Sequence, residues 1–105
     1  MEDKYKDCLA ACQICLVDCQ NCLMHMAGMN SSNDCPKCCV ICIDSCYACI
    51  KALSANSRWA TDYCRICAEI CTWCAEQCGA HDHDHCQQCA ESCRRCAEEC
   101  RKLAA

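Results

Sequence analysis

The chain has 105 residues, of which 21 are cysteine, two glycine, one proline and none phenylalanine. A formal net charge of −4 gives no electrostatic case for binding nucleic acid or an anionic membrane. The sequence has no apolar run of about 18 residues, so we expect no segment that spans a bilayer. We therefore expect one domain, covering residues 1–105, with neither nucleic acid nor membrane among its partners.

The first half of the chain predicts two helices. The first is expected over about residues 3–26, and the second over residues 35–54. Asp34 is a good N-cap for the second helix, and Pro36 is tolerated in a first helical turn because its missing N–H needs no partner there. The intervening segment is short, which favours antiparallel packing of the two helices.

The second half predicts two more helices. The third is expected over residues 57–78 and ends before Gly79, a residue suited to the C′ position. The fourth is expected over residues 83–103, with Asp82 or Asp84 as its cap. Four helices with short connections predict an all-α fold, an antiparallel up-down-up-down four-helix bundle.

Each predicted helix carries five cysteines at alternating intervals of three and four residues. This spacing is the a/d seam of a heptad, where a helix normally places leucine or isoleucine in the core. The sequence therefore predicts a cysteine-lined core. The seam cysteines are Cys8, Cys12, Cys15, Cys19, Cys22, Cys35, Cys39, Cys42, Cys46, Cys49, Cys64, Cys67, Cys71, Cys74, Cys78, Cys86, Cys89, Cys93, Cys96 and Cys100. Cys38 lies off the seam. It could be an additional metal ligand or a residue with no role in metal binding.

The seam continues beyond the cysteines, and its two ends differ. At one end it reaches Tyr5, Leu53, Ala60 and Leu103, which should form an apolar plug. At the other end it reaches methionines, which should be core residues, and histidines lie near them in sequence. We expect this second end to be the entrance for metal, with the histidines either ligands or part of a solvated loop. Its candidate ligands are His25, Met26, Met29, His81 and His85, with Met24 and His83 close by.

Cysteines four residues apart on a helix lie on one face, with Cβ atoms about 5–6 Å apart. Two such sulfurs can close around one ion in a near-linear arrangement, which suits Cu(I) better than tetrahedral Zn²⁺. Nine CxxxC pairs are present: Cys8/Cys12, Cys15/Cys19, Cys35/Cys39, Cys38/Cys42, Cys42/Cys46, Cys67/Cys71, Cys74/Cys78, Cys89/Cys93 and Cys96/Cys100. We expect a capacity of about 10 ions if pairs act alone and about 20 if every thiolate bridges.

The N-terminal stretch MEDKYKD is charged and lacks the apolar segment of a secretory signal. We therefore expect a cytoplasmic protein, in which dense cysteine indicates metal binding more often than disulfides. We find no Ser/His/Asp, paired-carboxylate or phosphate-binding motif, and so expect no enzymatic activity. The second helix is apolar nearly all round, and the first carries leucines at seven-residue spacing. This pattern favours a homo-oligomer through the first two helices.

Three segments resemble the bacterial copper storage proteins, especially their cytosolic branch: CRICAEICTWCAEQC, HDHDHC and CQQCAESCRRCAEECRK. The resemblance covers essentially the whole chain. It implies a cysteine-lined four-helix bundle that takes many Cu(I) ions into its core and assembles as a homotetramer. It also implies that CxxxC pairs supply most sites, with histidines and methionines near one open end. Copper chaperones or copper enzymes are further expected partners.

Three alternatives remain open. A zinc or general metallothionein-like sink would use the same thiolates. An iron–sulfur electron carrier is suggested by the spacing of Cys12, Cys15, Cys19 and Cys22, although cluster ligands usually lie in loops rather than on continuous helices. A disulfide-stapled structural protein is the third, although cysteines four apart on a helix are barely within reach of one another.

Overall fold

The structure is a computed structural model that describes residues 2–104. Four long helices and one short 3₁₀ turn follow one another along the chain. They are η1 (Asp3–Tyr5), α1 (Lys6–Met26), α2 (Lys37–Ser54), α3 (Ala60–Gly79) and α4 (Asp84–Ala104). The described residues contain no β-strand, so the all-α prediction is confirmed.

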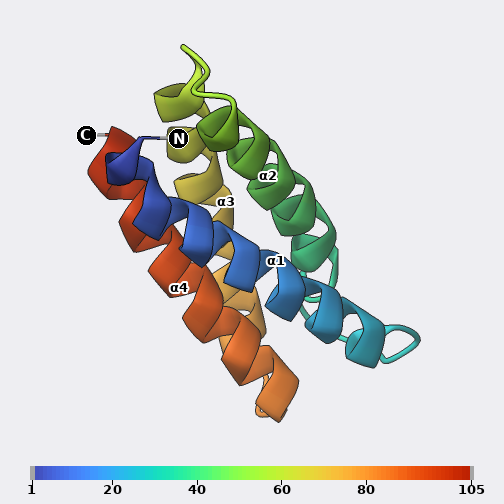
Figure 1. Cartoon of the computed structure of the whole chain (residues 1–105). Helices are drawn as coiled ribbons and strands as arrows, with labels where there is room; N and C mark the ends of the chain where they lie inside the picture. The colour runs from blue at the N-terminus through green and yellow to red at the C-terminus, as the bar shows by residue number, and fades with distance from the viewer. Residues whose placement is uncertain (1, 105) are drawn as a thin grey trace.

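The four helices form an antiparallel bundle (Figure 1). Helix α1 packs against α2 and α4, and α3 packs against the same two helices. The molecule measures 41 × 20 × 18 Å, and both chain ends lie at the same end of the bundle as the connection between α2 and α3 (Figure 1). This is the predicted up-down-up-down arrangement, in which all four seams face one core.

The contact between α3 and α4 is the most extensive in the bundle. Alanines at seven-residue spacing explain this close approach, because each presents only a methyl group to the neighbouring helix. Ala68 and Ala75 of α3 and Ala90 and Ala97 of α4 are all buried. The partly buried residues beside the core on α1 and α2 are larger and include Leu16 and Ile43 among others.

Helix α2 begins at Lys37, two residues later than the expected start at Cys35. The predicted N-cap is wrong, because the Asp34 side chain makes no capping hydrogen bond to the helix. Its carboxylate instead accepts a hydrogen bond from the Trp73 indole N–H at 3.2 Å. Pro36 occupies the N-cap position rather than the first turn.

Helix α3 begins at Ala60 rather than at the expected Ser57. The reason is that Asn56 and Ser57 cap the C-terminal end of α2. Asn56 adopts a left-handed conformation with φ of +52°. Its N–H donates to the Leu53 carbonyl at 3.1 Å, and the Ser57 N–H donates to the Ala52 carbonyl at 2.9 Å. These two bonds form a Schellman motif, which satisfies the last carbonyls of α2.

Gly79 is the last residue of α3, not the C′ residue that follows it. A Cβ atom at this position would lie 3.1 Å from Arg94 Nη2, so Gly79 serves the close approach of α4 and not a left-handed turn. Helix α4 then begins at Asp84, one residue after the expected start at His83.

The core of the bundle consists mainly of sulfur. All 21 cysteines are buried, and none is more than 1% exposed. At the end that holds the chain termini, Tyr5, Leu53 and Ala60 are buried and Leu103 is partly buried. The predicted apolar plug is therefore present, and it closes one end of the core with carbon.

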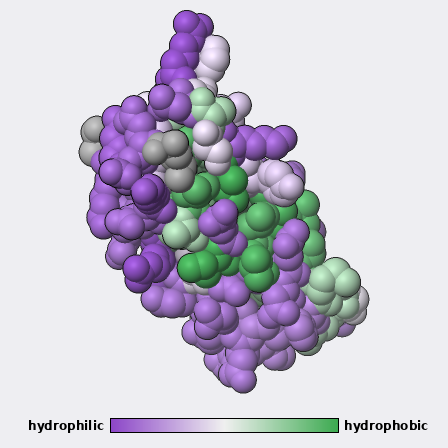
Figure 2. All heavy atoms as spheres, in the orientation of Figure 1, coloured by the Kyte–Doolittle hydropathy of each residue, from purple (hydrophilic) through white to green (hydrophobic). Residues whose placement is uncertain are grey.

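One outer face, over α1 and α2, is apolar. Figure 2 shows a band of hydrophobic atoms on the side of the molecule where these helices face the viewer in Figure 1. Its exposed members include Ile14 and Val17 of α1 and Val40 and Ile41 of α2. A face of this kind is typical of a surface that packs against another protein.

Candidate metal centre

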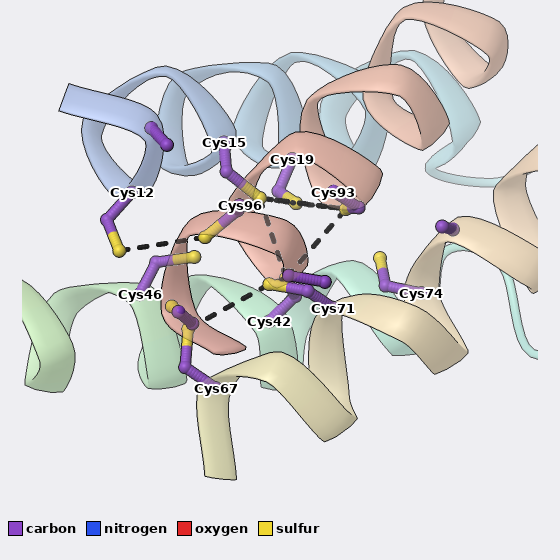
Figure 3. Packing of buried hydrophobic residues seen from close by; sticks show 14 of the residues in the cluster. Cys12, Cys15, Cys19, Cys42, Cys46, Cys67, Cys71, Cys74, Cys93 and Cys96 are labelled. Atoms are coloured by element: carbon purple, nitrogen blue, oxygen red, sulfur yellow. Dashed lines mark hydrogen bonds between the residues drawn. The ribbon is translucent and has the colours of Figure 1, made fainter. Parts of the chain in front are cut away.

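The cysteine side chains of all four helices point toward one another in the core. Figure 3 shows this for the central part of the bundle, where sulfurs from α1, α2, α3 and α4 meet. The helical period places every third or fourth residue on one face, and antiparallel packing brings the four faces together. No two cysteines are joined by a disulfide, so every sulfur is a free thiol.

The quartet next to the apolar plug shows how the helices share a site. Cys8, Cys49, Cys64 and Cys100 come one from each helix, and their sulfurs all lie within 4.8 Å of one another. The Cys8 and Cys100 sulfurs are 3.5 Å apart, and those of Cys49 and Cys64 are 3.7 Å apart. These separations are short enough for a single ion to bind several thiolates, with metal–sulfur bonds of about 2.3 Å.

Sulfurs in the middle of the core belong to more than one group. Cys15 Sγ lies 3.6 Å from Cys93 Sγ, 3.8 Å from Cys42 Sγ and 3.9 Å from Cys19 Sγ, and these four sulfurs form one quartet. A second quartet consists of Cys15, Cys46, Cys71 and Cys96. Because Cys15 takes part in both, the groups are joined into a network and are not separate metal sites.

The CxxxC pairs are not uniform in geometry. Within residues 2–104, three of the nine pairs have sulfurs in direct contact. They are Cys15/Cys19 at 3.9 Å, Cys67/Cys71 at 3.8 Å and Cys74/Cys78 at 3.9 Å. Bonds of about 2.3 Å place two sulfurs about 4.6 Å apart in linear coordination and about 4.0 Å apart in trigonal coordination. The sulfurs of these three pairs, at 3.8–3.9 Å, are therefore spaced for trigonal coordination and are closer together than linear coordination requires.

Cys38 lies off the seam but belongs to the core. Its sulfur is 3.7 Å from that of Cys78, which is also within 3.6–3.9 Å of the sulfurs of Cys35, Cys39 and Cys74. Cys78 is thus the centre of a five-sulfur cluster that α2 and α3 build with the segment just before α2. Cys38 could not be placed from the seam alone, because its burial depends on how closely α2 approaches α3.

Twelve of the 21 core thiols have a pKa raised above its ordinary value, and eight have a pKa lowered by hydrogen bonds with neighbouring thiols. Burial raises the pKa of the Cys35 thiol to about 12, with a smaller contribution from the charge of Cys22. Burial and the same neighbour also raise the pKa of Cys86. Thiols of this kind stay protonated at pH 7 and behave as small apolar residues, which allows the bundle to pack without metal.

At the end opposite the plug, four histidines stand in a row. The ring centroids of His25 and His85 are 4.8 Å apart, those of His85 and His83 are 5.2 Å apart, and those of His83 and His81 are 6.4 Å apart. His85 Nδ1 lies 3.5 Å from Cys86 Sγ, the outermost cysteine of α4. The structure therefore brings together imidazoles from the end of α1 and the start of α4 beside the thiol core.

His81 makes contacts that differ from those of the other three histidines. Its Nε2 lies 2.9 Å from Asn33 Oδ1 and 3.2 Å from Ser31 Oγ. Asn33 also donates to the Gln77 carbonyl at 2.9 Å and accepts from the Cys35 N–H at 3.0 Å. These bonds, which we call the Asn33 clasp, fasten the connection between α1 and α2 to the end of α3. Sequence reasoning missed Asn33 and Ser31, and their only signal was a polar Ser-Ser-Asn-Asp run.

The two candidate methionines of the seam have different surroundings. Met26 is 1% exposed and closes the inner end of the seam, as expected. The prediction that Met29 is also a core residue is wrong, because Met29 is 44% exposed. Helix α1 ends at Met26, and Ala27 and Gly28, the latter with φ of +82°, form a type II turn closed by the Met29 N–H to Met26 carbonyl bond at 3.0 Å.

The fold and the core define a thiol-lined four-helix bundle with imidazoles and a thioether at one end. No helix in residues 2–104 has both the length and the hydropathy that a membrane span requires. The sequence profile of the copper storage proteins matches residues 1–105. The chain belongs to the copper storage protein family.

Relatives and solved structures agree with this assignment. A cysteine-rich protein of Bacillus subtilis (strain 168), YhjQ, is 37% identical over 80 residues, which are 74% of this chain and 68% of that protein. The structure resembles the Cu(I)-bound copper storage protein BsCsp3 with a TM-score of 0.93 and 36% identity, covering 98% of this chain and 100% of that one. It resembles the metal-free Csp3 of Bacillus subtilis with a TM-score of 0.86 and 38% identity, covering 96% and 99% of the chains. The Nmul_A1745 protein of Nitrosospira multiformis gives a TM-score of 0.87 and 30% identity, covering 99% and 97%.

Proposed function

We propose that this protein stores and buffers Cu(I) in the cytoplasm, with the cysteine thiolates of its core as ligands. The observation that carries this proposal is the network of 21 buried thiols, in which single sulfurs belong to several quartets. Soft thiolates prefer Cu(I), and a thiolate that bridges two ions allows many ions to share one core. The Cu(I)-bound state of the similar protein BsCsp3 supports this choice of metal.

Charge also favours Cu(I) over Zn²⁺. When one Cu⁺ replaces one thiol proton, the charge of the core does not change. When Zn²⁺ binds four thiolates, each site gains two negative charges in an interior that excludes water, and burial of uncompensated charge is costly. Zinc would also need four ligands around each ion, whereas Cu(I) accepts two or three thiolates.

We infer a capacity of about 10–20 Cu(I) ions per chain, the range between isolated CxxxC pairs and full bridging. The three CxxxC pairs with sulfurs in contact support direct participation of these pairs. Two further pairs, Cys89/Cys93 and Cys96/Cys100, have sulfurs within 4.8 Å of one another, a separation that allows linear coordination. Storage in this form needs no catalytic group, and we propose no reaction for the protein.

A zinc sink is the second candidate, because a quartet such as that of Cys8, Cys49, Cys64 and Cys100, with one thiol from each helix, would also suit a tetrahedral ion. Anaerobic titration of the reduced protein with Cu(I) against a coloured chelator, repeated with Zn²⁺, separates the two. We expect Cu(I) to bind at more than about ten ions per chain and to displace any zinc. Zinc that binds at the same stoichiometry and resists displacement by Cu(I) would overturn the copper assignment.

We propose that Cu(I) enters at the end that carries His25, Met26, Met29, His81 and His85, because the other end is closed by the apolar plug. Met26 is buried in the last turn of α1, the turn that also carries His25. Replacing His25, Met26, Met29 and His81 together should slow loading several-fold and leave the final capacity nearly intact. Stopped-flow transfer of Cu(I) from a chelator measures both, and an unchanged rate would contradict the entrance.

We also propose that the protein assembles as a homotetramer through the apolar face of α1 and α2. Val17 is 61% exposed on this face and Ile41 46% exposed, which is costly unless another surface covers them. Copper chaperones or copper enzymes are the partners that would deliver and receive the ions. A cytoplasmic location fits thiols that are all free.

A further inference from the structure

Four cysteines in the middle of the core have sulfurs that form closed triangles. Cys15 Sγ and Cys93 Sγ are 3.6 Å apart, and Cys42 Sγ lies 3.8 Å from the first and 4.0 Å from the second (Figure 3). Cys19 Sγ completes a second triangle on the same edge, 3.9 Å from Cys15 Sγ and 3.8 Å from Cys93 Sγ. No other three thiols within residues 2–104 all hydrogen-bond to one another. We call these four residues the triangle cysteines.

The triangle cysteines offer sulfur and no other ligand. All four side chains are fully buried, and their sulfurs hydrogen-bond only to other sulfurs among the described residues. They belong to α1, α2 and α4, so packed helices and not a loop hold the triangles in place. An atom bound in a triangle would therefore have three sulfur ligands in surroundings that exclude water.

A triangle of sulfurs suits an atom that bonds to three sulfurs as a pyramid. Trivalent arsenic is such an atom, and its bonds to sulfur are similar in length to metal–thiolate bonds. Bonds of about 2.3 Å at angles of about 90–110° place the sulfurs about 3.3–3.8 Å apart. The sides of the two triangles measure 3.6–4.0 Å. The sulfurs would approach one another by only about 0.5 Å or less to bind such an atom.

Charge favours arsenic over the divalent ions that also bind thiolates. A divalent ion held by three thiolates carries one net negative charge, and burial of an uncompensated charge is costly. Arsenous acid is uncharged at neutral pH, and so is the product that it forms with three thiols. Its uptake therefore leaves the charge of the core unchanged, as the exchange of a proton for Cu(I) does.

We propose that the triangle cysteines bind trivalent arsenic, taken up as arsenous acid, so that the core is also a sink for arsenite. Three As–O bonds break and three As–S bonds form, and each thiol proton leaves with one hydroxyl group as water. Arsenic stays trivalent, so the step needs no oxidant or reductant. Cys15 and Cys93 are ligands in either triangle, and Cys42 or Cys19 is the third. This binding activity goes beyond copper storage and does not rest on it.

X-ray absorption at the arsenic edge tests the site directly. The reduced, metal-free protein receives one equivalent of sodium arsenite per chain without oxygen. We expect three sulfur neighbours and no oxygen neighbour around arsenic, and a native mass spectrum in which one arsenic atom replaces three hydrogens. An arsenic atom with fewer than three sulfur neighbours, or one that keeps an oxygen, would overturn the proposal.

Two double variants locate the site, with affinities measured from the ultraviolet absorption of the As–S bonds. Cys15→Ser/Cys93→Ser leaves neither triangle intact and should bind the first arsenite at least about tenfold more weakly, because linked ligands are lost. Cys8→Ser/Cys100→Ser is the matched control, since it also removes one pair of contacting thiols from α1 and α4, 3.5 Å apart, but no triangle. This control should bind the first arsenite as tightly as the unaltered protein.

The Cu(I) capacity and the helical circular dichroism of both variants separate this proposal from the storage function. Each variant should stay helical and lose a similar, small part of its Cu(I) capacity, because each lacks two of the 21 thiols. An arsenite defect confined to Cys15→Ser/Cys93→Ser would support the arsenic site whatever the Cu(I) capacity is. Equal arsenite affinity in the two variants would overturn it. If a variant loses its helical structure, the arsenic neighbours in the unaltered protein decide the question.

Discussion

At the scale of the residue, cysteine has two roles in this protein. As a neutral thiol it fills a core position in place of leucine, and as a thiolate it is a soft metal ligand. Burial favours the first state, since it raises the pKa of Cys35 to about 12. Metal binding favours the second state, because the ion replaces the proton and restores neutrality without water.

The raised pKa values predict how the stability of the metal-free protein depends on pH. In the unfolded chain the thiols ionise near their usual pKa of about 8.5, whereas buried thiols such as Cys35 and Cys86 remain protonated well above it. Proton loss from the unfolded state alone lowers the free energy of unfolding as the pH rises. We therefore expect the contribution of these two thiols to be constant below about pH 8 and to be lost progressively between about pH 8.5 and 12.

Anaerobic urea denaturation at a series of pH values, followed by circular dichroism, measures this dependence. Protein loaded with Cu(I) is the matched sample, because its sulfurs carry no proton to lose. Its unfolding should vary little over the same range. A metal-free protein that is equally stable at pH 7 and pH 10 would show that its core thiols are not held neutral by burial.

The predictions for single residues succeeded where the helical period decided the environment. The seam placed all its cysteines and Met26 in the core, since each lies three or four residues from another seam position. Met29 continues the same spacing but lies outside the core, because Gly28 adopts a positive φ and turns the chain away. A glycine between the two methionines was the one sign that the helix had ended.

At the scale of the element, the helix interiors and the last residues of α1 and α2 were predicted from the sequence, whereas the first residues of α2 and α3 were not. Gly79 was expected to end α3 by its conformation, whereas its position is explained by the side chain of Arg94 on α4. The Asn33 clasp joins two connections that are far apart in the chain, so nothing near Asn33 in the sequence predicts its partners. Contacts of this kind depend on the packed bundle.

The Asn33 clasp predicts a local change in stability. Asn33→Ala removes the acceptor for the Cys35 N–H and for His81, and the donor to the Gln77 carbonyl. Buried groups left without partners cost about 1–3 kcal/mol, so amide exchange in residues 31–36 should become about tenfold faster or more. Hydrogen–deuterium exchange with mass spectrometry measures this effect.

Ser32→Ala is the matched control for the clasp, because Ser32 is exposed and its hydroxyl makes no hydrogen bond within residues 2–104. This variant should exchange like the unaltered protein. Equal protection of residues 31–36 in the Asn33→Ala and Ser32→Ala variants would show that the clasp does not hold the connection in place.

The apolar plug makes a second prediction at this scale. Leu53 is fully buried at the end of α2, so Leu53→Ala should lower the free energy of unfolding of the metal-free protein by about 2–5 kcal/mol. Ile66→Ala removes a side chain that is 47% exposed and should cost no more than about 0.5 kcal/mol. Anaerobic urea denaturation compares the two variants, and similar losses would contradict the sealed end.

At the scale of the whole molecule, we expect the four-helix bundle to fold both with and without metal in its core. Close packing of small neutral thiols allows four helices to assemble first, and the shared sulfurs then accept ions with little change in charge. The two ends give this core a direction, with carbon at one end and imidazole and thioether groups at the other. The direction follows from antiparallel packing, which brings together the start of α1 and the end of α4.

The count of Cu(I) ions per chain tests the central claim most directly. Native mass spectrometry of the reduced protein, loaded without oxygen and washed with a Cu(I) chelator of moderate affinity, gives this number. We predict about 10–20 retained Cu(I) ions per chain, as a shared sulfur network requires. Retention of four ions or fewer, as expected for about one isolated cluster, would contradict storage by the whole core.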